Sequence, residues 1–158
     1  MRSLGCLGAL LLTAQAAPPS GVVLGDIEVR LFYKETGRLS EDILSRKRDF
    51  VFHNTIIGEG DAVEAADDLL VSVVLSSGKF GKPEDNQKGV QSPVELVARG
   101  ANGKLLGRRV HPSVLTSFGG TETKTLWLND VTCSGEITIT ATFAGQTKST
   151  RFVMGCGE

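Results

Sequence analysis

The sequence predicts an all-β fold, an antiparallel β-sandwich of the immunoglobulin or fibronectin type III kind. Apolar and polar residues alternate with a period of two in several short segments, and turn residues separate these segments at regular spacing. No segment has a strong helical period. Trp127 precedes both Cys133 and Cys156, so the Cys–Trp–Cys order of true immunoglobulin domains is absent, and only the architecture is predicted. A small closed β-barrel is the alternative.

The N-terminus has the features of a secretory signal peptide at residues 1–16. Arg2 supplies the positive charge, and Leu4 to Leu12 is an apolar run about half the length of a membrane span. Ala14-Gln15-Ala16 fits the small-x-small cleavage pattern, so cleavage is expected before Ala17. The product would be secreted or periplasmic, with residues 17–158 as a single β-sandwich domain and no transmembrane segment after cleavage.

Seven to eight short strands are expected along the mature chain. They cover residues 26–33, 49–57, 69–77, 94–100, 104–111, 123–131, 135–143 and 148–155. In the first, Ile27, Val29 and Leu31 alternate with charged residues, which is typical of a half-buried strand. The segment Leu69 to Ser77 is the most apolar of the mature chain and is expected in the centre of a sheet.

The segments between the strands carry turn signals. Lys34 to Arg48 is polar and mainly loop, with a short helical turn at Ser40 to Ile43. Gly78 to Pro93 is rich in Gly, Pro and charge, and a loop of this length is either functional or disordered. Asn102-Gly103 is a strong signal for a two-residue hairpin turn. Further along, Leu126 and Leu128 share one face of their strand and Trp127 lies on the other.

Cys133 and Cys156 are predicted to form a disulfide, because an exported chain with an even cysteine count favours one. The last two strands can form a hairpin that turns at Ala144-Gly145 and pairs residues whose numbers sum to 289. Cys133 and Cys156 satisfy this sum, and their parity places them on the apolar face. The expected result is a buried disulfide that stabilises the fold by about 2–4 kcal/mol.

The stretch GEGDAVEAADD, residues 58–68, is the strongest candidate for a metal site. Calcium takes six to eight oxygen ligands, often from closely spaced carboxylates on a loop. The candidate ligands are Asp61, Glu64, Asp67 and Asp68. The spacing does not match an EF-hand, and a solvated connection between two strands is the favoured interpretation, with the calcium site as the alternative. No cofactor other than this calcium is expected.

The charge balance gives no argument for a nucleic-acid partner, because the chain without Arg2 has 16 basic and 18 acidic residues. Two local clusters of basic residues are nevertheless present. One is Arg46 to Arg48, and the other flanks the Asn102-Gly103 turn and consists of Arg99, Lys104, Arg108 and Arg109. If the second cluster shares one face, it could meet an anionic partner such as lipid headgroups or an acidic glycan. A solvated strand face is the favoured interpretation.

No catalytic residue is predicted, and the chain is not expected to be an enzyme. The only histidines are His53 and His111, and no GxSxG motif is present. The leading hypothesis is an exported, non-enzymatic binding or interaction module for a protein or an envelope or extracellular component. Recognition would lie on the loop Gly78 to Pro93 and on the acidic stretch. A calcium-stabilised module and a small secreted hydrolase are the alternatives.

Overall fold

The computed structural model describes residues 21–46, 61–63, 66, 68–77, 87–117, 120–131 and 133–155. This part of the chain is all-β and antiparallel, as predicted, and two 3-10 turns interrupt the strands. In order, the elements are β1 (Val22–Tyr33), β2 (Arg38–Leu39), η1 (Ile43–Ser45), β3 (Asp68–Ser77), β4 (Gln87–Val90), β5 (Val94–Arg99), η2 (Ala101–Gly103), β6 (Leu105–His111), β7 (Val114–Ser117), β8 (Thr121–Leu128), β9 (Gly135–Phe143) and β10 (Gln146–Met154). Within the described ranges, no helix has the length and apolar character needed to cross a bilayer.

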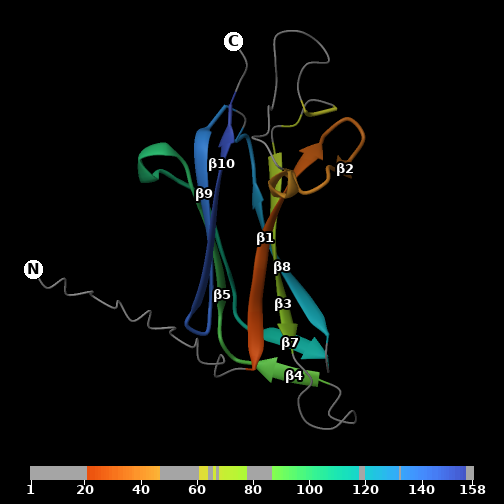
Figure 1. The fold of residues 1–158 in the computed structure, drawn as a ribbon, viewed down its shortest axis with the longest axis vertical. Coiled ribbons are helices and arrows are strands. Elements are labelled where there is room, and N and C mark those ends of the chain that lie inside the picture. The colour runs from red at the N-terminus through yellow and green to blue at the C-terminus, as the bar shows by residue number, and fades with distance from the viewer. Residues whose placement is uncertain are drawn as a thin grey trace, which may run out of the picture.

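The strands form two four-stranded sheets and one two-stranded ladder (Figure 1). Sheet I has the order β2-β1-β3-β8, and sheet II has the order β10-β9-β5-β6. The β4-β7 ladder lies at one end of the molecule. In the described part of the chain these ladders stay separate, so they do not form the single closed ladder of a small barrel.

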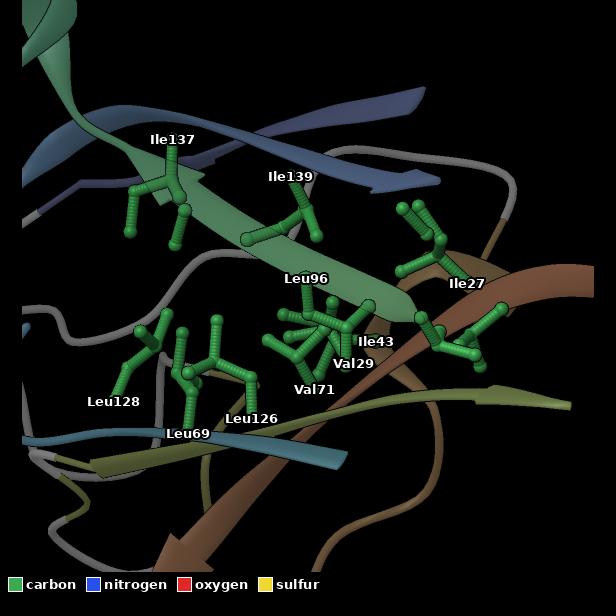
Figure 2. Close-up of a cluster of buried hydrophobic side chains, with 14 of the residues drawn as sticks. Ile27, Val29, Ile43, Leu69, Val71, Leu96, Leu126, Leu128, Ile137 and Ile139 are labelled. Carbon is green, nitrogen blue, oxygen red and sulfur yellow. The ribbon is translucent and has the colours of Figure 1, made fainter. Parts of the chain in front are cut away.

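The core lies between the two sheets (Figure 2). Leu96, Ile137 and Ile139 of sheet II face a layer of sheet I side chains that includes Val29 and Val71. All five are fully buried, because the two-residue period of each strand turns every second side chain inward. Burying one such side chain contributes roughly 1.5–3 kcal/mol relative to leaving it exposed, so this layer is the main source of stability.

The last hairpin has the register that the sequence predicts. Gln146 pairs with Phe143 and Met154 pairs with Gly135, so each pair sums to 289. Ala144 and Gly145 have φ angles of 45° and 81°, the two positive values that a type I′ turn requires. The prediction of an Ala-Gly turn is therefore confirmed.

Cys133 is disulfide-bonded, but it is exposed, so the prediction of a buried disulfide is wrong at this residue. Cys133 and Gly135 have φ angles of 59° and 68°. These left-handed residues interrupt the strand alternation, so the inward parity of Ile137 does not extend back to Cys133. Cys156 lies outside the described residues, and its pairing with Cys133 stays a prediction.

Several segment boundaries differ from expectation. β1 begins at Val22, earlier than predicted, and the predicted loop from Gly78 to Pro93 contains β4. The short helical turn is η1, whose N-cap Asp42 accepts a hydrogen bond from the N–H of Leu44. The expected strand at residues 49–57 lies outside the described residues. The same holds for residues 1–20, so the signal peptide and its cleavage site stay predictions.

Side chains close the two seams at which sheet I meets sheet II. At the β1–β10 seam, the Gln146 amide accepts from the N–H of Leu24 and donates to the carbonyl of Val22, each at 2.9 Å. Lys148 Nζ lies 3.0 Å from Asp26 Oδ1 at the same seam. At the β6–β8 seam, His111 Nε2 lies 2.9 Å from the carbonyl oxygen of Thr125. These contacts occupy strand edges that would otherwise be open to other chains.

Candidate functional site

Two of the four predicted calcium ligands are described, and both have protein partners. Asp61 Oδ1 accepts a hydrogen bond of 2.8 Å from Arg46 Nη1. Asp68 Oδ1 accepts from the N–H of Asp130 at 3.0 Å and lies 3.7 Å from Lys34 Nζ. These contacts neutralise part of the charge that a cation would need.

Glu64 and Asp67, the other two predicted ligands, lie outside the described residues. In the described part of the chain, no group of three or more His, Cys, Asp or Glu side chains is arranged to hold a metal ion. The calcium site stays a prediction, and a calcium-dependent rise in melting temperature is the measurement that tests it. Of the predicted recognition loop Gly78 to Pro93, residues 78–86 lie outside the described residues.

The outer face of sheet II carries a group of polar side chains from three neighbouring strands and from β6. The alternation that buries Ile137, Ile139 and Ala141 turns the intervening threonines of β9 outward. We call this surface the arginine–threonine face. Its basic and hydroxyl residues are Arg99, Arg108, Thr138, Thr140, Thr142, Thr147, Ser149 and Arg151, and the same register places Glu95, Glu136, Val97, Val110 and Val153 on this face.

Strand register places the arginines in neighbouring rows across this face. Arg99 of β5 lies directly opposite Thr138 of β9, and Thr138 lies directly opposite Arg151 of β10. In the next row, Arg108 of β6 lies opposite Val97, which is opposite Thr140. The sequence reasoning missed Arg151, although the register that sums to 289 already placed it beside Thr138.

The face keeps an excess of positive charge. Arg108 Nε donates to Glu95 Oε1, and Arg151 Nη1 lies 3.4 Å from Glu136 Oε2. Arg99 Nη1 instead donates to the carbonyl of Gly103 at 3.0 Å, and no acidic partner for it is present among the described residues. A hydrogen bond to a carbonyl leaves the guanidinium charge uncompensated, so Arg99 remains available to an anion.

The predicted basic cluster does not share one face. Arg108 and Arg99 lie on the outer face, whereas Arg109 pairs with Leu96 and so has the opposite, inward parity. Arg109 remains exposed because β6 is the edge strand of sheet II. Lys104 lies in the turn between β5 and β6, where it is exposed beside the end of the arginine–threonine face.

Glu122 lies beside Lys124 and His111, which makes a further group of titratable side chains in the described structure. Burial raises the pKa of Glu122. The hydrogen bonds from Lys124 and from the N–H of Leu115, together with the charges of Lys124 and His111, lower the pKa by more than burial raises it. The net result is a pKa below the ordinary value. The contact of His111 with the Thr125 carbonyl gives the imidazole a structural role at the seam. His53 lies outside the described residues.

Comparison with known proteins does not assign the chain to a family. No protein-family model matches the chain, and no curated protein matches it. Among solved structures, the chain is similar to Pseudomonas fluorescens alkylpurine DNA glycosylase AlkC bound to DNA containing an abasic site analog. The identity is 11%, the TM-score is 0.40, and the match covers 87% of this chain but only 31% of the glycosylase. A likeness this low transfers neither activity nor ligand.

The similar structure is named as a DNA glycosylase bound to DNA, and three sequence predictions differ from that description. The first prediction is that the chain is an exported, non-enzymatic binding module, with a calcium-stabilised module and a small secreted hydrolase as alternatives. The second is that the chain is not an enzyme. The third is that its partner is a protein or an envelope component and not a nucleic acid. The second and third rested on the absence of a sequence signal, and the first rested also on the predicted signal peptide and the long loops. We do not retain them.

Proposed function

We propose that the arginine–threonine face binds a polyanion, specifically the phosphodiester backbone of a nucleic acid, without reading the base sequence. The observation that carries the proposal is the row Arg99–Thr138–Arg151, which spans three neighbouring strands. Contacts to phosphate come mainly from Arg and Lys, supported by Ser and Thr hydroxyls, and this face presents both kinds of donor.

The spacing of the donors supports this proposal. Adjacent strands lie about 4.8 Å apart, so Arg99 and Arg151 are about 10 Å apart with the Thr138 hydroxyl between them. The second row adds Arg108 and Ser149, so donors cover an area rather than a point. The chain as a whole has a formal net charge of −1, and so attraction would be confined to this face and would be sensitive to salt.

We also propose that the fold is a sandwich of the fibronectin type III kind. Among the described residues, the seven longer strands in chain order are β1, β3, β5, β6, β8, β9 and β10. The first, second and fifth lie in sheet I, and the other four lie in sheet II. In constant immunoglobulin domains the fourth strand lies in the same sheet as the first, second and fifth. Here the fourth strand, β6, lies in the other sheet, and this is the one difference. The order supports the fibronectin-like arrangement.

The proposal is tested with fluorescently labelled single-stranded and duplex DNA, followed by anisotropy at several salt concentrations. We expect binding at low salt, and a slope of log K against log salt that shows phosphate contacts. Arg99→Gln and Arg151→Gln should each weaken binding to every sequence and reduce that slope by about one. Thr138→Val, which removes the hydroxyl between them, should weaken binding less.

The matched control is Arg38→Gln, because Arg38 is an exposed arginine of β2 in the opposite sheet. It should leave both affinity and slope unchanged. The proposal is wrong if the protein does not bind either DNA at low salt, or if Arg38→Gln weakens binding as much as Arg151→Gln.

A further inference from the structure

The outer face of sheet I carries a cluster of partly exposed apolar side chains, which we call the aromatic patch. It consists of Phe32, Leu39, Leu70 and Trp127. Phe32 pairs with Leu39 across β1 and β2, and Leu70 pairs with Trp127 across β3 and β8. The rings of Phe32 and Trp127 lie edge to face, with centroids 4.9 Å apart and planes at 65°. Phe32 thereby supports the indole in one orientation.

Solvent still reaches the patch. Trp127 is 36% exposed, although its neighbours in β8, Leu126 and Leu128, are buried in the core, and Leu39 is 43% exposed. A solvent-exposed tryptophan costs hydrophobic free energy that burial would recover, and clustered exposed apolar groups mark ligand or partner sites. The indole also combines an apolar ring with one N–H donor, which suits a ligand with both apolar and polar faces.

Polar groups border the patch on the same face. Arg30 pairs with Leu70, so Arg30, Leu70 and Trp127 form one row across the sheet. With strands about 4.8 Å apart, Arg30 lies about 10 Å from Trp127. Arg30 Nη2 lies 3.1 Å from Glu28 Oε2, and Arg30 Nη1 donates to the carbonyl of Ser40 at 3.3 Å. The guanidinium and the carboxylate are therefore held in place beside the apolar row.

The charges around the patch do not favour an anion. The charge of Arg30 is matched by Glu28, and Lys34 lies 3.7 Å from both Asp68 and Asp130. The surroundings thus sum to neutral or slightly negative, unlike the arginine–threonine face. An uncharged ligand with an apolar face and a rim of hydroxyl groups fits this combination. Such a rim can accept from the guanidinium and donate to the carboxylate.

From this arrangement we infer that the aromatic patch is a binding site for an uncharged sugar ring. The C–H face of one pyranose lies against the indole of Trp127, and the hydroxyls of the next ring of an oligosaccharide reach Arg30 and Glu28. The site is independent of the proposed nucleic-acid face, because the two lie on the outer faces of opposite sheets.

The test uses the fact that Trp127 is the only tryptophan in the sequence. Cellohexaose, maltohexaose and laminarihexaose, all uncharged, are titrated into the full protein while tryptophan fluorescence is followed. We expect a saturable change with at least one of them. Calorimetry then compares variants: Trp127→Ala should weaken binding at least about tenfold, and Trp127→Phe should retain part of it. Arg30→Gln should weaken binding about threefold or more.

Val153→Ala is the control, because Val153 is an exposed apolar residue of sheet II. It should leave sugar binding unchanged, as should Arg151→Gln, which separates this site from the proposed nucleic-acid face. If Trp127→Ala does not fold, Trp127→Phe and Arg30→Gln decide the question. The inference is overturned if none of the three oligosaccharides gives a saturable signal. It is also overturned if the variants bind as the wild type does, or if oligothymidylate, titrated in parallel as a ligand that is not an uncharged sugar, is the only compound that changes the tryptophan fluorescence.

Discussion

Gly25 occupies the position at which β1 loses its simple register with β3. Leu24 pairs with Leu75 and Ile27 pairs with Val73, so two residues of β1 lie opposite the single residue Val74. This is the geometry of a β-bulge. A Cβ at Gly25 would lie 2.6 Å from the carbonyl oxygen of Val74, which is closer than a carbon and an oxygen can approach without a shift of backbone.

We predict that Gly25→Ala destabilises the protein by about 1–3 kcal/mol, because the clash is with backbone rather than with a movable side chain. Gly89→Ala is the control, since its Cβ would have only Leu115 Cδ1 within reach, at 4.0 Å. Urea unfolding of the two variants and the wild type measures the difference. Equal midpoints for both variants would show that the bulge can relax at no cost.

At the scale of elements, the free edge of β1 is protected by side chains instead of by a long neighbouring strand. β2 pairs only with Phe32 and Tyr33. Further along the edge, Asp42 Oδ1 accepts from the N–H of Val29 at 2.9 Å, and Ser40 Oγ accepts from the N–H of Leu31 at 2.9 Å. Asp42 has a second role, because the same oxygen caps η1. One carboxylate therefore fixes the loop after β2 and covers part of the strand edge.

Asp42→Ala should destabilise the protein by about 1–3 kcal/mol, because two backbone N–H groups lose their acceptor. Asp42→Asn keeps an acceptor oxygen at the same position and should recover most of the loss. Hydrogen exchange should locate the effect, with faster exchange at the N–H groups of Val29 and Leu44. If Asn is as damaging as Ala, the charge and not the hydrogen-bond geometry is what matters.

Elements with strong alternation could be predicted from the sequence, because alternation is a local property. This explains the correct prediction of β9, β10 and the turn between them. β4 could not be predicted, because Gln87 to Val90 has no alternation and the strand forms only by pairing with β7. Only part of the aromatic patch could be predicted from the sequence. Sequence placed Trp127 away from Leu126 and Leu128, but its contact with Phe32 depends on the order β1-β3-β8, which no local pattern shows.

For the whole molecule, stability depends on how well separate ladders are joined, and β8 is central to this. Glu122 of β8 accepts from the N–H of Leu115 in β7 at 2.7 Å and from Lys124 Nζ at 2.6 Å. His111, at the edge of sheet II, contributes to lowering the pKa of Glu122. One carboxylate thus links sheet I to the β4-β7 ladder and lies near the β6–β8 seam.

The stabilisation from Glu122 should depend on pH. Its folded-state pKa is lowered, so the contribution is fully present above the unfolded-state value near 4.5 and is lost as pH falls through the folded-state value. We expect Glu122→Gln to lose at most about 1 kcal/mol at neutral pH, because the site is partly exposed, and to approach the wild type in acid. Thermal melts of both proteins from pH 7 to about pH 3 measure this.

Glu35→Gln, at an exposed glutamate in the turn after β1, controls for the loss of one negative charge. A stability gap between Glu122→Gln and the wild type that widened toward acid pH would contradict a lowered folded-state pKa of Glu122.

The β1–β10 seam has a mechanical consequence. The contacts Leu24–Gln146 and Asp26–Lys148 advance by two residues on each strand, so β1 and β10 run in the same direction. The described chain therefore starts at one end of the seam and finishes at the other. If the two ends were pulled apart, the load would act along the seam in shear, and the Gln146 and Lys148 contacts would share it. That geometry resists tension better than one in which contacts are peeled open singly, so the domain would act as a stiff link under load.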